Sequence, residues 1–206
     1  MGYDPDSIRE KFGDDYIASE QTFIMGIDQR FTQYFARRFK GLTVLESCTG
    51  GGFTTLSLAK TARHVFTVEI NPVTREQAGK NLARAGLDSK VSFLSGDVMD
   101  PATLKDLPHM DAAFLDPDWA VTSADHVYRF RNSNTQPPAD ALLDRVFGIT
   151  GNIALVLPPF IPEDEFNHLP DHEHQRLYLG DELALFCLYF GDLMEVCGET
   201  EFRVPA

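Results

Sequence analysis

The chain of 206 residues lacks three features that would point to a membrane or to the outside of the cell. No apolar run approaches the ~20 residues that a membrane-spanning helix needs. The opening residues, "MGYDPDSIREKFGDDY", are polar and acidic, unlike those of a secretory signal. The cysteines are odd in number and lack metal-ligand spacing: Cys48, Cys187 and Cys197. We therefore expect reduced thiols in a cytoplasmic protein.

Positive charge is scarce as well. The 18 Lys and Arg residues face 31 Asp and Glu residues, which gives a net charge of −13. This balance opposes strong nonspecific binding of nucleic acid, which depends on releasing counterions. One local exception is "QRFTQYFARRFK", residues 29–40, which places four cations among aromatic residues: Arg30, Arg37, Arg38 and Lys40. It is either an amphipathic helix with a solvated basic side or a face that contacts phosphates.

A metal site is not expected either. "DHEHQ" contains His172 and His174, but no cysteine or further histidine lies near them. We interpret this stretch as a solvated turn, and we expect no metal. The chain also has no internal repeat and no low-complexity linker, and its length suits one domain with a core.

From residue 41 onward, strand patterns and helix patterns alternate. The predicted strands are Thr43–Cys48, His64–Ile70, Lys90–Asp97, Asp111–Asp116 and Asn152–Pro158, followed by Glu182–Gly191 and Thr200–Val204. Helices are predicted from Phe53, from Pro72 to Gly86, near "PATLKDL", and over Ala139–Phe147. Alternation of this kind indicates a mostly parallel sheet with helices on both faces. The last two strands are separated by a short polar turn, so we expect them to pair as an antiparallel hairpin.

Ligands of open α/β sheets bind outside the carboxyl ends of the strands, and acidic residues stand at four such ends here. Glu46 lies near the end of the first strand and the triple glycine Gly50–Gly52 follows it; glycines let a ligand approach the backbone closely. Glu69, after the second strand, can accept both hydroxyls of a ribose. Asp97 after the third strand can accept an exocyclic amine. Asp116 ends the fourth strand, and together these acids predict a ligand that contains adenosine.

Two common nucleotide sites are excluded by what the glycine turn lacks. A P-loop requires a Lys followed by Ser or Thr, and a dinucleotide fingerprint requires a third spaced glycine; "GGGFTT" offers neither. An acid four residues before the first glycine suits a cationic ligand instead. S-adenosyl-L-methionine (SAM), which carries a sulfonium, is such a ligand.

The motifs together resemble those of class I SAM-dependent methyltransferases. More narrowly, "DPDW" (residues 116–119), "LYFGDLM" (188–194) and "EINPVTREQAGKNLARAGL" (69–87) resemble the trimethylguanosine synthase, or RNA cap guanine-N2 methyltransferase, family. The resemblance covers about Ile24 to Met194. It implies a Rossmann-like α/β fold, a seven-stranded mostly parallel sheet with its last strand antiparallel and helices on both faces. It also implies an N-terminal helical segment, residues 1–40, packed on a methyltransferase domain, residues 41–206.

The resemblance implies roles for residues at the strand ends. The cofactor SAM would be bound by Glu46, Thr49, Gly50, Gly52, Phe53, Thr54, Glu69, Ile70, Asp97, Val98 and Asp116. The catalytic, acceptor-side residues would be Asp116, Pro117, Asp118 and Trp119. Met25 and Gly26 are candidates for a lid over the cofactor.

The acceptor motif departs from the family at one position, because Asp118 stands where those enzymes have a second proline. Asp116 can accept an N–H of an exocyclic amine, and Trp119 offers a flat face to a purine. Asp118 could accept further N–H groups of guanine, or repel a phosphate-rich substrate. The following residues, Ala120–Pro138, interleave aromatic and basic side chains, which suits either nucleotide contact or a surface loop without a role.

The leading interpretation is therefore transfer of a methyl group to an exocyclic amine, with guanine N2 in RNA as the first choice of acceptor. An RNA or other nucleotide-containing substrate is the expected partner, with no membrane and no metal. Two alternatives remain open: a methyltransferase that acts on a small molecule or a protein, and a SAM-binding module that has lost catalysis.

Overall fold

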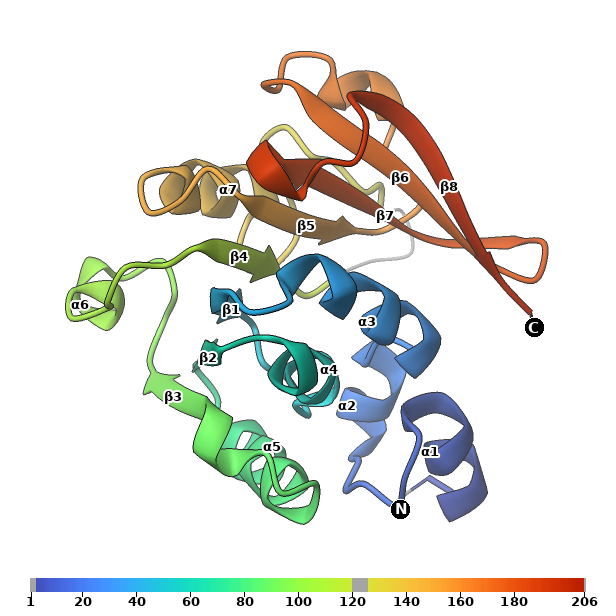
Figure 1. Cartoon of the computed structure of the whole chain (residues 1–206). Helices are drawn as coiled ribbons and strands as arrows, with labels where there is room; N and C mark the ends of the chain where they lie inside the picture. The colour runs from blue at the N-terminus through green and yellow to red at the C-terminus, as the bar shows by residue number, and fades with distance from the viewer. Residues whose placement is uncertain (1–2, 120–125, 206) are drawn as a thin grey trace. The chain divides into compact units, whose positions relative to one another are not determined.

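The computed structural model describes residues 3–119 and 126–205. The chain divides into two compact units, Met1–Asp111 and Ala112–Ala206, coloured blue to green and green to red in Figure 1. Across the two described ranges, no helix is both long enough and apolar enough to cross a membrane.

The first unit begins with helices and then alternates strands and helices. Its strands are β1 (Thr43–Ser47), β2 (His64–Glu69) and β3 (Val91–Ser95). Its helices are α1 (Pro5–Phe12), α2 (Glu20–Met25), α3 (Gln29–Ala36), α4 (Phe53–Thr61), α5 (Pro72–Arg84) and α6 (Pro101–Leu104). Short 3-10 turns are η1 (Arg37–Phe39) and η2 (Asp88–Lys90).

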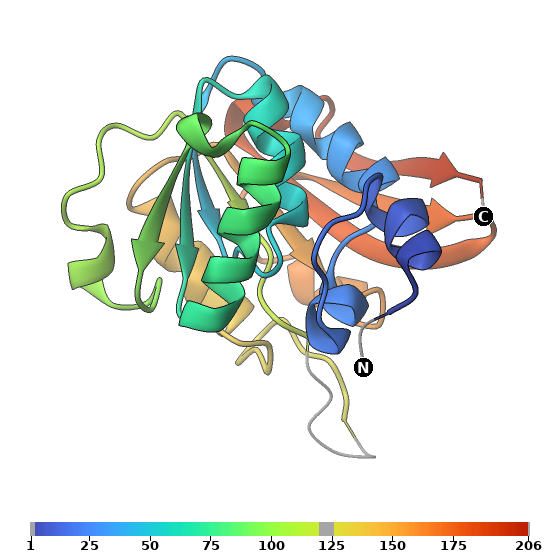
Figure 2. The same cartoon turned by 90° about the horizontal axis from the view of Figure 1, so that it is seen from below.

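The three strands of the first unit lie in the order β3-β2-β1 and run parallel. Ser47 pairs with Val68, and Glu69 pairs with Ser95, so the carboxyl ends of all three strands reach one edge. Figure 2 shows the strands running the same way, with α5 in front of them. The alternation predicted from the sequence is confirmed in this unit, and the edge collects the residues that follow each strand.

The N-terminal helices share a hydrophobic core with α4 and α5. Ile8, Phe12 and Tyr16 are buried against a cluster formed by Phe53, Leu56 and Leu82. The rings of Phe12 and Phe53 stack with centroids 3.5 Å apart and an interplanar angle of 2°. Since Phe53 is the first residue of α4, this stack joins α1 to the start of that helix.

Asn81 of α5 joins three segments of backbone. Its side chain is fully buried, its Oδ1 accepts a hydrogen bond from Ile17 N (2.7 Å), and its Nδ2 donates to Ile17 O (3.0 Å) and to Gly51 O (2.9 Å). One turn earlier, Gln77 Nε2 donates to Ile17 O and to Thr22 Oγ1. The glycine turn after β1 is therefore bonded, through α5, to the chain between α1 and α2.

The second unit contains five strands and one α-helix among its described residues. The strands are β4 (Ala112–Leu115), β5 (Ile153–Leu157), β6 (His172–Leu179), β7 (Glu182–Phe190) and β8 (Gly198–Val204). The helix α7 spans Ala139–Phe147, as predicted, and 3-10 turns are η3 (Glu163–Phe166) and η4 (Gly191–Leu193). The strand order is β4-β5-β7-β6-β8, in which β7 alone runs against both of its neighbours.

Two expectations for the second unit are wrong. "DHEHQ" is not a turn: His172 and His174 begin β6, opposite Phe190 and Leu188 of β7. The final hairpin is also different, because β7 pairs antiparallel with β6 across the tight turn at Gly180, and β8 pairs parallel with β6. The described chain therefore has eight strands, where the sequence predicted seven.

The sequence of β6 has no hydrophobic pattern typical of a strand, because several of its buried side chains are polar. Glu173 is fully buried and accepts hydrogen bonds from Thr200 Oγ1 (2.7 Å), Glu195 N (2.8 Å) and Gln175 Nε2 (3.4 Å). These donors come from β8, from the residues before it and from β6 itself. A buried carboxylate with such partners is tolerated in a folded protein. The polar stretch that contains it, however, resembles the sequence of an exposed turn.

We predict that Asn81→Leu lowers the free energy of unfolding by about 2–4 kcal/mol. The substitution keeps the side chain's bulk but leaves the buried Gly51 carbonyl oxygen and the part-buried Ile17 N–H without their partners, while Ile17 O keeps its bond from Gln77 Nε2. Urea unfolding of the full chain measures the effect. Gln77→Met is the matched control, since it removes two half-exposed hydrogen bonds and should cost about 1 kcal/mol. An equal cost for both variants would contradict the assignment.

Candidate functional site

The turn after β1 is shaped by glycines that serve different purposes. Gly50 has φ +55° and Gly52 has φ +81°, both in the left-handed region. A Cβ on Gly52 would lie 3.0 Å from the Cβ of Ala78, so the close approach of α5 requires glycine there. A Cβ on Gly50 would meet only the Cys48 carbonyl oxygen, at 3.9 Å. The backbone at Gly50 is therefore open to a ligand.

Glu69 connects this turn to the end of β2. Its side chain is buried; Oε2 accepts a hydrogen bond from Gly50 N (2.9 Å), and Oε1 accepts one from Asn71 N (2.8 Å). Each carboxylate oxygen has two lone pairs, so both oxygens can accept a further hydrogen bond. The carboxylate is oriented by backbone and retains capacity for two hydroxyl groups.

Three other predicted residues follow the ends of β2 and β3. Ile70, next to Glu69, leaves 67% of its surface exposed. Asp97 is exposed, and its Oδ1 accepts a hydrogen bond from Met99 N (2.8 Å). Val98 is buried. The edge thus offers an apolar surface beside two carboxylates.

Glu46 lies beneath the turn, in the interior of the unit. It is 2% exposed, and its Oε2 accepts a hydrogen bond from Thr55 Oγ1 (2.6 Å). Burial raises the pKa of Glu46 to about 7; hydrogen bonds from Thr55 and Thr67 oppose the rise, and the charge of Glu69 adds to it. Thr49 and Thr54 are buried here too.

The lid candidates pack against the start of α4. A Cβ on Gly26 would lie 2.8 Å from ring atoms of both Phe12 and Phe53, so only glycine fits between them. Met25, the last residue of α2, is 39% exposed. Phe53 is buried between this segment and the unit's core, which makes it a packing residue in this structure.

In the second unit, the predicted acceptor motif follows β4 directly. Pro117 is buried, and Asp116, Asp118 and Trp119 are partly buried. Asp118 N donates to Gln136 O (2.8 Å), and Gln136 N donates to Asp118 O (2.9 Å). A proline at position 118 would lack the N–H for the first of these bonds. The family's second proline is therefore incompatible with this bridge.

Trp119 is fixed through its backbone but not through its indole. Its carbonyl oxygen accepts a hydrogen bond from Tyr128 Oη (2.9 Å). The indole Nε1 is buried and has no hydrogen-bond partner among the described residues. A buried N–H without an acceptor is uncommon in folded proteins, and a bound ligand is one way to satisfy it.

The residues after Trp119 fall in two parts. Ala120–Asp125 lie outside the described residues. From His126 onward the loop is organised by Glu165 of η3, which accepts hydrogen bonds from Arg129 Nη1 (2.7 Å), Phe130 N (2.8 Å) and Arg131 N (2.9 Å). Burial alone would raise the pKa of Glu165, but these hydrogen bonds outweigh it and lower the pKa. The loop has a defined structure, and the sequence reading did not include Glu165.

The family of this chain follows from its match to a known family model. Residues 42–169, more than half of the chain, match the family model described as "RNA cap guanine-N2 methyltransferase". The chain belongs to the RNA cap guanine-N2 methyltransferase family. This confirms the resemblance inferred from "DPDW" and its neighbouring motifs.

Solved structures share the fold of this family member at low sequence identity. A chain from Porphyromonas gingivalis W83, described as a methyltransferase, is 20% identical with a TM-score of 0.74 over 90% of this chain. The O-methyltransferase TomG from Streptomyces achromogenes is 18% identical with a TM-score of 0.58, over 90% of this chain and 86% of TomG. TrmK from M. capricolum is 9% identical with a TM-score of 0.55, over 84% and 70% of the two chains.

The match to the P. gingivalis protein covers 47% of that chain, so the present chain spans about half the length of that protein. All three likenesses show the fold, a mostly parallel Rossmann-like sheet with one reversed strand. The fold class predicted from the sequence is thereby confirmed, apart from the additional strand.

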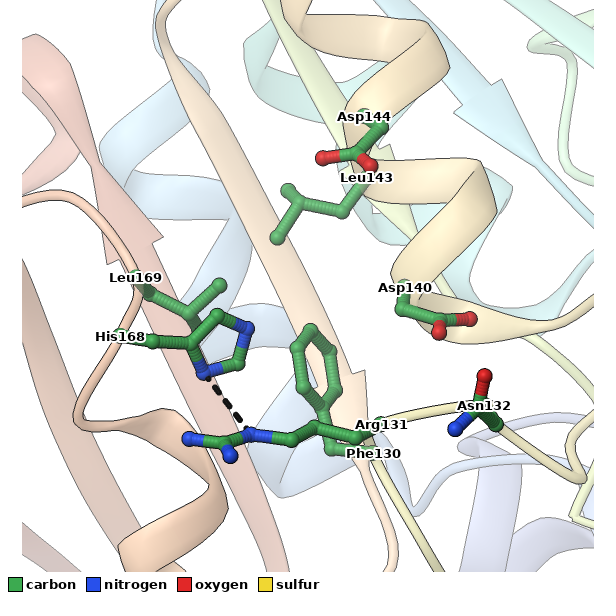
Figure 3. A pocket seen from close by; sticks show the side chains of 8 residues that line it. All are labelled: Phe130, Arg131, Asn132, Asp140, Leu143, Asp144, His168 and Leu169. Atoms are coloured by element: carbon green, nitrogen blue, oxygen red, sulfur yellow. Dashed lines mark hydrogen bonds between the residues drawn. The ribbon is translucent and has the colours of Figure 1, made fainter.

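A cavity of about 230 Å³ opens in the second unit, beside α7 (Figure 3). Asp140 and Asp144 line one wall, and Arg131 with His168 lines another. Arg131 Nε donates a hydrogen bond to His168 Nδ1 (3.2 Å), and the ring of Phe130 stands between the two walls. None of the family motifs includes this cavity.

One group of side chains in the described ranges has the spacing of metal ligands: Glu163, His174 and Glu199. Arg176 already forms salt bridges with Glu163 and, at 3.0 Å, with Glu199. Those hydrogen bonds raise the pKa of Arg176, and burial lowers that of His174. We assign the group to a charge network that joins η3, β6 and β8.

We predict that Glu46 makes stability depend on pH. Because its folded pKa is raised from 4.5 to about 7, its contribution is fully present below pH 4.5 and is lost as pH rises to about 7. The loss is about 3 kcal/mol. Urea unfolding between pH 4 and 8 should show that loss in the wild type relative to Glu46→Gln. Glu76→Gln, at an exposed glutamate, should behave as the wild type; an identical profile for all three proteins would contradict the assignment.

Proposed function

We propose that this chain is a SAM-dependent methyltransferase whose acceptor is an exocyclic amine, namely guanine N2 in RNA. The observation that carries the proposal is the edge of the first unit, where oriented Glu69, exposed Ile70 and open Gly50 occur together in a member of this methyltransferase family. TomG and TrmK, which share the fold, were solved with SAM and with S-adenosylhomocysteine respectively.

The first unit's edge fits the adenosine part of such a cofactor. Glu69 would accept hydrogen bonds from the ribose hydroxyls, Ile70 and Val98 would contact the adenine ring, and Asp97 would accept its amine. Gly50 would let the ligand approach the turn. Glu46, buried below the turn, would offset the positive charge of the cofactor, because a nearby cation favours the ionised form of its carboxylate. When bound, SAM supplies an activated methyl group on a positively charged sulfur.

The residues after β4 would hold the acceptor. Methylation of a ring-conjugated amine needs the nitrogen lone pair aimed at the methyl carbon within ~3–3.5 Å. Asp116 would accept one N–H of that amine and offset the positive charge that develops on nitrogen. Trp119 would stack on the base, and its indole N–H would find an acceptor on the substrate. Asp118 would accept a second N–H, which guanine can donate from N1.

RNA would also contact the basic stretch that includes η1. Arg30 is engaged by Asp28, whose carboxylate accepts from Arg30 Nε (2.9 Å) and Nη2 (2.8 Å). Arg37 and Lys40 are exposed. We assign phosphate contact to the exposed Arg37 and Lys40 before Arg30 and Arg38.

The domain arrangement and location extend the proposal. Residues 1–40 would be a helical segment of a methyltransferase domain that occupies residues 41–206, with Met25 and Gly26 near the cofactor. The location we propose is cytoplasmic, as inferred from the sequence.

The net charge of −13 and Asp118 favour one competing function, methylation of a small molecule or a protein. Incubation of the chain with methyl-labelled SAM and with RNA, metabolite and protein fractions separates the candidates. Label in RNA guanine N2 supports the proposal, label in another fraction supports the competitor, and bound SAM without transfer indicates a module that has lost catalysis.

We predict that Glu69→Ala weakens SAM binding about 10- to 150-fold. Hydrogen bonds to a charged group contribute about 1.5–3 kcal/mol, and this variant removes the carboxylate that would accept from the ribose. Calorimetry with SAM or S-adenosylhomocysteine measures the change. Glu76→Ala, at an exposed acid of α5, is the matched control and should bind as the wild type does.

Glu69→Gln separates charge from shape, because the amide keeps the side chain's volume and one acceptor oxygen. It should lose affinity by less than Glu69→Ala. If the wild-type chain binds neither ligand at millimolar concentration, the cofactor assignment is wrong.

We predict that the acceptor residues act after cofactor binding. Trp119→Ala should leave SAM affinity nearly intact but weaken acceptor binding by ~1–3 kcal/mol, the contribution of base stacking. Asp116→Asn should lower kcat about 10²-fold with little change in cofactor affinity, because its interaction grows as charge develops on nitrogen. Single-turnover transfer assays and calorimetry distinguish the two effects.

Asp118→Ala is a cleaner test of the departure from the family than Asp118→Pro, since alanine keeps the N–H that bonds to Gln136 O. A fall in RNA methylation would support Asp118 as an acceptor of guanine N–H groups. Variants at 116, 118 and 119 that all fold, bind SAM and methylate like the wild type would show the acceptor assignment to be wrong.

A further inference from the structure

The carboxyl end of β5 exposes an aromatic ring that no family motif explains. Phe160 follows β5 by three residues, after Pro158 and Pro159, and leaves 71% of its surface exposed. Scattered exposed apolar residues are common in soluble proteins and need no explanation. Phe160 is different because it is not isolated: its ring stacks on Tyr128, with centroids 5.9 Å apart and an interplanar angle of 23°.

Tyr128 links this ring to the acceptor motif. Its hydroxyl donates to the Trp119 carbonyl oxygen (2.9 Å), and its ring meets His126 edge-on at 4.6 Å. Burial raises the pKa of Tyr128, and the negative charge of Asp118 raises it further, so the hydroxyl stays protonated and remains a donor. Val127, which lies between His126 and Tyr128 in the sequence, is also exposed.

The position of the pair is the one that ligands use in this type of sheet. β4 and β5 run parallel, so Trp119 after β4 and Phe160 after β5 follow carboxyl ends at the same edge. The contacts of Tyr128 with both residues are within the second unit. The aromatic pair therefore neighbours the residues assigned to the acceptor.

The charge of the chain indicates what such a surface would contribute. A net charge of −13 opposes strong attraction of phosphates, so contacts that do not depend on charge would add to those of the basic stretch at η1. Stacking of a base on an aromatic ring does not depend on charge and contributes about 1–3 kcal/mol per base. Exposed rings beside the acceptor residues would therefore add affinity for RNA that does not depend on the protein's charge.

We propose that Phe160 and Tyr128 form a stacking platform for an unpaired RNA nucleobase next to the one that is methylated. The inference rests on the proposed function, because it takes Trp119 as the residue that stacks on the methylated guanine. Phe160 offers the open ring face, and Tyr128 holds that ring against the acceptor motif.

The test uses Trp119, the only tryptophan, as a fluorescent reporter in the full chain. A short single-stranded guanine-containing oligoribonucleotide and guanosine monophosphate are titrated separately, in the presence of S-adenosylhomocysteine. Phe160→Leu should raise the Kd of the oligonucleotide about 5- to 150-fold, the equivalent of one lost stack. The Kd of the mononucleotide should change by less than about twofold, because it has no neighbouring base.

Four controls distinguish stacking from other effects. Phe160→Tyr retains an aromatic ring and should bind the oligonucleotide as the wild type does. Val196→Ala, at an exposed apolar residue before β8, should have no effect. The loss in Phe160→Leu should persist at high salt, unlike a loss of phosphate contacts. The melting temperature of Phe160→Leu should match that of the wild type, because the Phe160 side chain is exposed.

Each other outcome overturns a defined statement. If the wild type binds the oligonucleotide and Phe160→Leu binds it equally well, the platform is wrong while the proposed function stands. If Phe160→Leu weakens both ligands equally, the ring holds the methylated base itself, and the assignment to a neighbouring base is wrong. If the wild type binds no oligonucleotide and methylates no RNA, the RNA acceptor is wrong and the platform with it.

Discussion

The first unit depends on two buried side chains that form hydrogen bonds with the backbone of the glycine turn. Glu69 accepts from Gly50 N, and Asn81 donates to Gly51 O. A turn with left-handed residues has backbone groups that no regular element can pair, and these two side chains pair them. The same bonds orient the Glu69 carboxylate and connect the turn to the N-terminal helices through Ile17. Under the proposed function, ligand recognition and stability would therefore use the same atoms in this unit.

The second unit achieves a comparable result with a different device. Glu165 bonds three successive residues of a long loop, and Asp118 forms a bridge with the far end of that loop. The departure from the family's second proline is explained locally, because the Asp118 N–H is one half of the bridge. An acidic residue at this position can thus have a backbone role whatever its side chain does in catalysis.

Helices and strands with a strong apolar pattern were predictable, and those with buried polar residues were not. α7 and β1, β2, β4 and β5 lie within a residue or two of their predicted bounds. β6 was interpreted as a turn because Glu173, His174 and Gln175 are buried in it, two of them held by partners 20 or more residues away. The partner of β8 was predicted wrongly for the same reason. Because β6 was not recognised as a strand, β8 was assigned to β7 instead.

The sequence by itself determined the family, the alternating architecture and the set of acids that end the strands, because these depend on local patterns and short motifs. Only the tertiary structure decided that Glu46 is buried while Glu69 is oriented at the edge, and that Asn81 and Glu165 bond distant backbone groups. It also decided that Phe160 stacks on Tyr128. Burial and hydrogen bonding depend on residues far apart in the chain, and no periodicity records which of them meet.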